Sequence, residues 1–295
     1  MRMLYQFIIF SFLFLSCRDV PRPFEESVSV CAAEVLPDTS LVQSLIDPSG
    51  KTPETRFKVP DGFQRVKADS TSFGYYLRKL PLKPAGSKVK YYNGNEKDGE
   101  GVYDAVVDLP IGNKDLHQCA DAVMRLRAEY LYSQKQYDKI HFNFTNGFRC
   151  DYSEWIKGKR VAVNGNNVSW KQSALPSNTR TDFWNYLEMV FSYAGSLSLS
   201  KELVSVAVNN IQPGDVFIHG GSPGHAEIVL DVAMHPKNGK RLFMLAQSYM
   251  PAQETQILIN PNDKKISPWY SVDFGEILET PEYRFERTEL KRFKD

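Results

Sequence analysis

The sequence has few of the residues that build metal centres and disulfide frameworks. Its 295 residues include only 4 cysteines and 5 histidines. None of these stands at the short spacing typical of zinc ligands, since His219 and His225 lie on either side of a Gly-Ser-Pro-Gly turn. We therefore expect no metal site.

An excess of charge of either sign is also absent. The 36 Lys and Arg residues balance 35 Asp and Glu residues, and no block of basic residues recurs. This pattern excludes the electrostatic footprint of a nucleic-acid-binding protein. Internal repeats are absent too, and an apolar content of 42% is that of a globular protein with an ample core. Function must therefore come from a local site, and no obligate protein partner is indicated.

Long hydrophobic runs are missing except near the N-terminus. Residues 7–15 (FIIFSFLFL) precede a serine and Cys17. This run is too short for a transmembrane helix, which needs about 20 residues, but it has the length of a signal-peptide core. A small residue directly before Cys17 is typical of the lipobox of bacterial lipoproteins, although Phe14 and Leu15 stand where a leucine and a small residue are usual.

We predict a signal peptide at residues 1–16 and a lipidated N-terminus and tether, rich in Pro, Ser and Asp, at 17–56. A single domain is predicted to follow at 57–295. Lipid on Cys17 would anchor the exported protein to the inner or outer membrane of the cell envelope. An ordinary cleaved signal, in which Cys17 is incidental, is the alternative interpretation.

If Cys17 carries lipid, three cysteines remain for an oxidising compartment: Cys31, Cys119 and Cys150. Three is an odd number, so one thiol is left over. A Cys31–Cys150 disulfide would leave Cys119 free, whereas a Cys119–Cys150 disulfide would remove it as a nucleophile. The sequence does not choose between these pairings.

The periodicity of apolar residues predicts the order of secondary-structure elements. Strand-like segments lie first, at residues 63–66, 75–80, 89–92 and 102–109. Helical spacing follows, at residues 115–130, 181–194 and 203–208. Strands return at residues 215–218, 226–233, 242–248 and 256–259. Strands, then helices, then a β-meander indicate an α+β fold.

A thiol and an imidazole stand in positions suited to nucleophilic catalysis. With Asp115 as the cap, Cys119 lies in the first helical turn, where partial positive charge stabilises a thiolate. His225 follows a tight turn and begins an apolar strand, so the sheet can hold its ring beside a cleft. Together they predict a Cys–His pair. Because Cys119 shares an apolar stripe with Val123 and Leu126, a buried core cysteine is the alternative.

Three amide side chains complete the predicted site. Gln247 is the only polar residue on its face of the next strand, and it can orient the imidazole of His225. Gln118 or Asn113, together with the backbone N–H of Cys119, can stabilise an oxyanion.

The segments around these residues resemble a known group of enzymes. HQCADAVMRL (117–126) resembles the Gln-Cys helix of CHAP amidases, which are papain-like and related to NlpC-type peptidases. PGDVFIHGGSPGHAEIVLDV, from Pro213, resembles their strand, Gly-His and strand segment, and LAQSY lies where they carry a third polar residue. The resemblance implies a papain-like core with the cysteine-bearing helix packed on an antiparallel sheet. Here the core gains an N-terminal β extension and an insertion at about 135–210.

The resemblance also implies amide hydrolysis without a cofactor, with Cys119, His225 and Gln247 as the catalytic residues and peptidoglycan or a peptide as the substrate. Gln247 departs from the more frequent Asn, Glu or His at the third position. QCADAVMRLRAEYLY and FTNG also resemble an uncharacterised family of bacterial lipoproteins.

A catalytically inactive module that binds a cell-wall glycan, a peptide or a protein partner is the alternative function. Its main support is the aromatic content of the insertion. The candidates for a substrate groove there are Trp155, Trp170 and Trp184. Packing within the loops is the other interpretation of these tryptophans.

Overall fold

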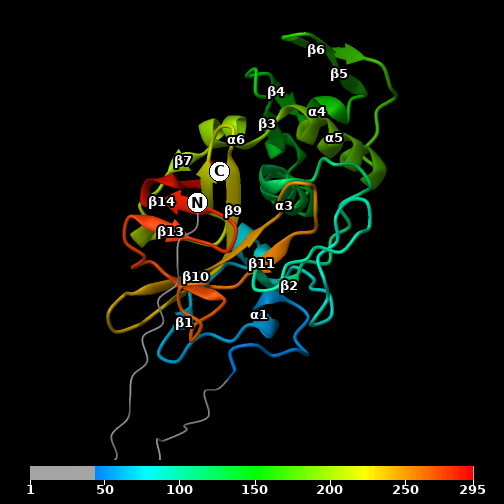
Figure 1. The fold of residues 1–295 in the computed structure, drawn as a ribbon. Helices are drawn as coiled ribbons and strands as arrows, with labels where there is room; N and C mark the ends of the chain where they lie inside the picture. Colours follow the sequence, from blue (N-terminus) through cyan, green and yellow to red (C-terminus); the bar gives the residue numbers. More distant parts are fainter. Residues whose placement is uncertain (1–43, 295) are drawn as a thin grey trace, which may run out of the picture. The chain divides into compact units, whose positions relative to one another are not determined.

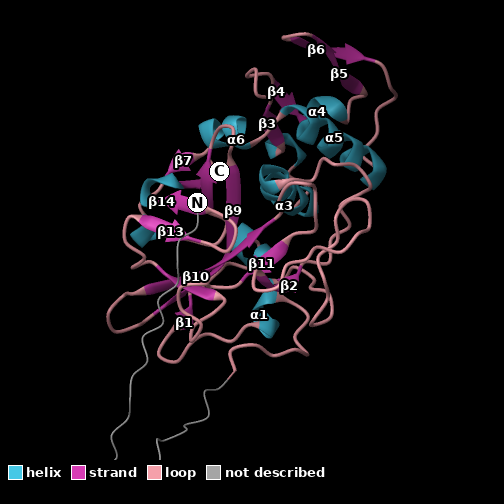
Figure 2. Ribbon diagram, in the orientation of Figure 1, coloured by secondary structure: helices cyan, strands magenta, loops and turns pink. Residues whose placement is uncertain are grey.

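The computed structural model describes residues 44–294, which form an α+β fold around one large antiparallel sheet (Figures 1 and 2). The predicted signal peptide, Cys17 and Cys31 lie outside the described residues. The helices are α1 (Pro53–Arg56), α2 (Phe73–Arg78), α3 (Cys119–Ser133), α4 (Tyr152–Trp155), α5 (Arg180–Tyr193) and α6 (Ser196–Glu202), with 3₁₀ turns η1 (Tyr137–Lys139), η2 (Val208–Asn210) and η3 (Arg287–Glu289). Among residues 44–294, no helix is long and apolar enough to cross a membrane.

The large sheet has 9 strands, and seven of them follow one another in space. In that order they are β2 (Tyr103–Val106), β11 (Gln256–Leu258), β10 (Arg241–Gln247), β9 (His225–Met234), β8 (Val216–His219), β15 (Leu290–Arg292) and β7 (Val204–Ser205). Two more strands pair off this path, β1 (Gln64–Arg65) with β9 and β12 (Trp269–Ser271) with β10. The remaining strands form three two-stranded ribbons, β3 (His141–Asn143) with β4 (Arg149–Asp151), β5 (Lys159–Asn164) with β6 (Asn167–Gln172), and β13 (Ile277–Glu279) with β14 (Arg284–Glu286).

Strand β9 is the most buried strand of the sheet, with every residue from His225 to Ala233 inaccessible to solvent. Ile228 and Leu230 pack in the cluster that contains the apolar residues of α3. Val229 and Val232 pack in a second cluster, which includes the inner residues of β13 and β14. Since both faces are covered, every polar side chain of β9 must find its partner inside the protein.

Asp231 is the clearest example of this requirement. Its carboxylate is fully buried and lies 2.6 Å from Arg65 Nε and 2.5 Å from Arg78 Nε. Arg65 belongs to β1 and Arg78 to α2, so one aspartate attaches two N-terminal elements to the central strand. These contacts explain why β1 and α2 lie against β9.

Helix α3 is buried on all sides from Cys119 to Leu131. It packs on β9 with one face and against α5 and α6 with others. Its sequence is rich in the strong helix formers Ala, Leu, Met, Arg and Glu. On its outer surface Arg125 lies 4.9 Å from the ring centroid of Trp184, and Arg180 binds Glu129 at 2.8 Å. The α5 segment therefore holds the cysteine-bearing helix against the sheet.

Two predicted elements were wrong. Residues 75–80 are not a strand, since residues 75–78 belong to α2. This helix buries Phe73, Leu77 and Arg78 at helical spacing, and the ring of Phe73 packs at a tilt on that of Tyr130. Residues 203–208 are not a helix, because the helix ends before them at Glu202 and the chain continues as β7. In both segments tertiary pairing overrides the local pattern.

Two further expectations differ from the structure in detail. Residues 89–92 form only isolated bridges, among them Tyr91 with Gln253. Residues 44–56, assigned to the tether from sequence, carry α1 and the buried Arg56, whose Nε donates to Gly50 O at 2.7 Å. A Cβ on Gly50 would lie 2.4 Å from the backbone of Arg56, so only glycine fits there.

We expect Asp231→Asn to lower the free energy of unfolding by roughly 3–5 kcal/mol, because two guanidinium groups lose their buried counter-charge. Urea denaturation measures this change. The matched control is Asp273→Asn, since Asp273 pairs with Lys240 at 3.2 Å on the surface with both side chains about 60% exposed. That variant should stay within about 0.5 kcal/mol of wild type, and equal stabilities of the two variants would contradict the role given to Asp231.

Candidate active site

Cys119 is the first residue of α3 and opens onto a pocket of about 280 Å³. Its side chain is 9% exposed, so the thiol is largely buried but borders the pocket. The predicted position in the first helical turn agrees with the structure, whereas the predicted cap does not. Gln118 is the N-cap residue, and Asp115 Oδ1 instead accepts from Ala252 N at 2.7 Å.

His225 begins β9 and lies opposite His219 of β8 in the sheet register. Its ring is 2% exposed, and the nearby Cys119 side chain contributes to raising its pKa. On the other side, Nε2 of the ring lies 2.6 Å from Gln247 Oε1. The structure thus brings the three predicted residues into one row, with the imidazole between the thiol and the amide.

The orientation of Gln247 is fixed by what lies behind it. Its Nε2 donates to Glu282 Oε2 at 2.6 Å, and Lys97 Nζ donates to the same oxygen at 2.6 Å. A carboxylate can only accept, so the amide nitrogen must face Glu282 and the amide oxygen must face His225. The ring nitrogen beside Gln247 therefore carries a hydrogen, and Nδ1 is left to face the thiol.

Glu227, a residue not predicted from the sequence, lies two residues after His225 on the same side of β9. Its side chain is fully buried, and Oε1 lies 3.6 Å from His225 Nε2. Thr280 Oγ1 donates to the same oxygen at 2.8 Å. The signal was present in the sequence, because a strand places residues i and i+2 on one face and an acidic residue is unusual in such an apolar run.

These charges set the protonation of the imidazole. Burial alone would lower the pKa of His225, but the hydrogen bonds and charges of Cys119 and Glu227 outweigh it and raise the pKa to about 10. At neutral pH the ring is therefore a cation.

Aromatic rings shield the imidazole from solvent. The ring centroids of Tyr249 and Tyr283 each lie 4.8 Å from that of His225, and Phe285 lies at 6.0 Å. A cation against aromatic faces is stabilised electrostatically. The rings also exclude water, so the hydrogen bonds of His225 act in a low-dielectric surrounding.

Besides the start of α3 and the larger side chains of Phe191 and Met250, the pocket beside Cys119 is lined by small residues from two other segments. Ala194, Gly195 and Ser196 come from the junction of α5 and α6, and residues 221–224 from the turn before His225. A Cβ on Gly224 would lie 2.2 Å from Ser196 Oγ, so glycine is needed where the turn meets α6. The tight turn and the helix therefore shape the pocket together.

The two predicted oxyanion residues are placed differently. Gln118 lines the pocket, and its Nε2 donates to Asp115 Oδ1 at 3.2 Å, which leaves its second N–H free to face the pocket. Asn113 is exposed and does not line this pocket. The first N–H groups of α3 have no intrahelical partners and supply further donors at Cys119.

None of the three predicted groove tryptophans lines the Cys119 pocket. Trp155 is 3% exposed and stacks on Arg160, whose guanidinium carbon lies 4.2 Å from the ring centroid. Trp184 covers Arg125 of α3, and Trp170 packs against Phe148 with ring centroids 5.6 Å apart. The burial of Trp155 excludes it from a surface groove, and packing of the insertion explains all three rings.

Cys119 and Cys150 are both free thiols, so the Cys119–Cys150 disulfide is absent. Cys150 is completely buried, and burial raises the pKa of its thiol. Its chemistry is therefore that of a small core residue.

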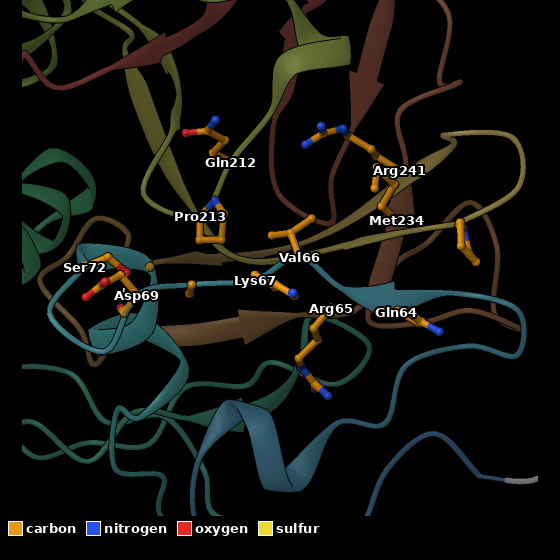
Figure 3. A pocket seen from close by; sticks show the side chains of 13 residues that line it. Gln64, Arg65, Val66, Lys67, Asp69, Ser72, Gln212, Pro213, Met234 and Arg241 are labelled. Carbon is orange, nitrogen blue, oxygen red and sulfur yellow. Dashed lines mark hydrogen bonds between the residues drawn. The ribbon is translucent and has the colours of Figure 1, made fainter.

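A second pocket of about 600 Å³ lies beside β1 (Figure 3). Its lining includes Val66, Pro213 and Met234, but no cysteine or histidine. In Figure 3 Arg65 extends away from Arg241, in keeping with its bond to Asp231. Within residues 44–294, no group of three or more His, Cys, Asp or Glu residues is placed to hold a metal ion.

The described residues thus define an α+β protein with a buried thiol–imidazole–amide row. The chain belongs to the family described as domain of unknown function 4846, DUF4846, whose model matches residues 54–292. This agrees with the expectation of an uncharacterised family. No curated protein and no solved structure matches the chain.

We expect iodoacetamide to modify Cys119 in the native protein and to leave Cys150 unmodified, because only Cys119 combines a pocket with an adjacent imidazolium. Peptide mass spectrometry assigns the adducts. Cys119→Ser should abolish labelling among the described residues, and the matched Cys150→Ala should not. An adduct on the Cys150 peptide at the same rate would contradict this difference.

Proposed function

We propose that the protein is a cysteine amidohydrolase or peptidase with a papain-like core, and that it acts in the cell envelope as a lipoprotein anchored through Cys17. Peptidoglycan is the proposed substrate. The observation that carries the proposal is the row of Cys119, His225 and Gln247, in which a helix N-terminus presents a thiol to an imidazole and an amide oxygen fixes the ring from behind.

In the first step the Cys119 thiolate attacks the carbonyl carbon of the amide and forms a tetrahedral intermediate. The imidazolium of His225 then gives its Nδ1 proton to the leaving nitrogen, and the carbon–nitrogen bond breaks. The products are a free amine and a thioester on Cys119. In the second step His225 accepts a proton from water, the hydroxide attacks the thioester, and the acid leaves as the thiolate is regenerated.

The negative charge of the tetrahedral oxygen needs donors near Cys119. The backbone N–H of Cys119 and the free N–H of Gln118 Nε2 are the proposed donors, since both residues border the pocket. The positive end of the α3 dipole acts in the same direction. Asn113 is not part of this proposal because it lies outside the pocket.

The lining of the pocket supports a substrate with a small side chain next to the scissile carbonyl. Ala194, Gly195 and Gly224 leave little side-chain bulk, and the whole pocket has a volume of about 280 Å³. Glycine- or alanine-sized groups fit such a space. Stem peptides of peptidoglycan carry alanine, which is consistent with a cell-wall substrate for an exported protein.

We expect purified peptidoglycan to release soluble muropeptides with the wild-type protein and none above background with Cys119→Ala. His225→Ala should lower the rate by roughly 10²–10⁴-fold, because proton transfer to the leaving nitrogen is lost. Mass spectrometry of the products identifies the bond that is cut.

The matched control is Cys150→Ala, which removes the other buried thiol and should leave the rate unchanged. Equal product release by wild type and Cys119→Ala would refute the thiol mechanism. Binding of peptidoglycan by wild type without release of any product would favour the alternative, a module that only binds the cell wall.

A further inference from the structure

Glu227 is a buried carboxylate that takes no part in the steps of the proposed mechanism. Its side chain is 0% exposed in the middle of an apolar strand. Oε1 accepts from Thr280 Oγ1 at 2.8 Å, but Oε2 has no hydrogen-bond partner. Burying a carboxylate in such a place is strongly unfavourable unless a positive charge lies nearby.

The nearest group that can supply this charge is the imidazole of His225, with Nε2 3.6 Å from Glu227 Oε1. The basic groups close by have other partners: Lys97 binds Glu282, and the two guanidiniums bonded to β9 belong to Asp231. Tyr249 and Tyr283 face His225 with their rings. Among residues 44–294, the ion-pair partner of the Glu227 carboxylate is therefore the imidazole of His225 in its protonated form.

His225 has other ionisable neighbours besides Glu227. The Cys119 thiol lies near it at the start of α3 and also raises its pKa. Glu282, on the turn between β13 and β14, is separated from it by Gln247 and carries Lys97 as counter-ion. His219 on β8 turns to Glu289 instead. Within residues 44–294, Glu227 is therefore the carboxylate near the imidazole for which no ion pair with a Lys or Arg is seen.

We propose that Glu227 is a positioning residue that holds His225 as an imidazolium facing Cys119, an inference that rests on the proposed function of this site. Gln247 fixes the direction of the ring, because its oxygen accepts from Nε2 along the axis toward Cys119. Glu227 lies beside the same nitrogen and fixes the charge of the ring. Thr280 holds the carboxylate in place through its hydroxyl.

This division of roles makes protonation of the leaving group independent of external pH over the neutral range. The raised pKa of His225, about 10, agrees with it. A group with a raised folded-state pKa stabilises the fold fully below its unfolded pKa, about 6.5, and loses that stabilisation as the pH rises through its folded pKa. The contribution of His225 to protein stability should therefore decline progressively between about pH 6.5 and about pH 10, whereas protonation of the leaving group should be lost only as the pH approaches about 10.

The test is an NMR titration of the His225 Cε1–H signal in the full chain, for wild type, Glu227→Gln and Glu227→Asp. We expect Glu227→Gln to raise the acid dissociation constant of His225 at least tenfold. Glu227→Asp should give a smaller change in the same direction, because its shorter side chain keeps the negative charge but holds it farther from the ring. The matched control, Glu289→Gln, removes the carboxylate beside His219 and should leave His225 unchanged.

If folded Glu227→Gln titrates like wild type, the inference is overturned. If Glu227→Gln does not fold, the titration of His225 in Glu227→Asp tests the inference instead. The inference is overturned as well if His225 titrates in that variant at the same pH as in wild type. Where muropeptides are released, the alkaline limb of the kcat/KM profile should move to lower pH in Glu227→Gln.

The two proposals fail in different ways. Release of muropeptides together with an unshifted titration refutes the role of Glu227 and leaves the hydrolase intact. A shifted titration in a protein that cleaves no peptidoglycan supports the Glu227–His225 pairing and refutes the hydrolase.

Discussion

The structure depends on a strand that is buried on both faces and still carries three ionisable groups. His225, Glu227 and Asp231 all lie on β9, where no solvent reaches them. Each must be matched by a partner from elsewhere, because an uncompensated buried charge destabilises a fold by several kcal/mol. Asp231 recruits β1 and α2 through their arginines, and Glu227 recruits the turn at Thr280. The matching of these charges therefore determines which distant segments lie against the sheet.

The candidate site uses the same constraint for chemistry. Gln247 and Glu227 hold the imidazole of His225 from one side, and α3 places the thiol of Cys119 on the other side. The first turn of α3, the amide of Gln247 and the turn before His225 are all rigid parts of the fold. Groups held this way need little reorganisation during a reaction, which is the condition under which fixed dipoles and charges are most effective.

The elements that carry the site could be predicted from sequence because their signals are local. The helical spacing after Gln118 lies within one element, and so does the apolar run after His225. Gln247 is likewise recognised within its own strand, as the single polar residue on its face. Glu227 also had a local signal, as an acidic residue two positions after His225 in an apolar strand, but its contact with Thr280 joins distant segments and could not be predicted. The helix α2 was missed because its aromatic residues suit either element locally and only packing on Tyr130 decides between them. Likewise, no local pattern distinguishes a tryptophan in a groove from Trp155 in a core.

The pocket beside Cys119 is formed by the start of α3, the junction of α5 and α6, and the turn that ends at Gly224. Ser196 reaches across to this turn, with Oγ 3.3 Å from Gly221 O. The imidazole comes from β9, which follows all three segments in the sequence, so a chain that ends before β9 contains the thiol without its imidazole neighbour. The candidate site is thus complete only in the folded chain, where β9 and α3 have come together.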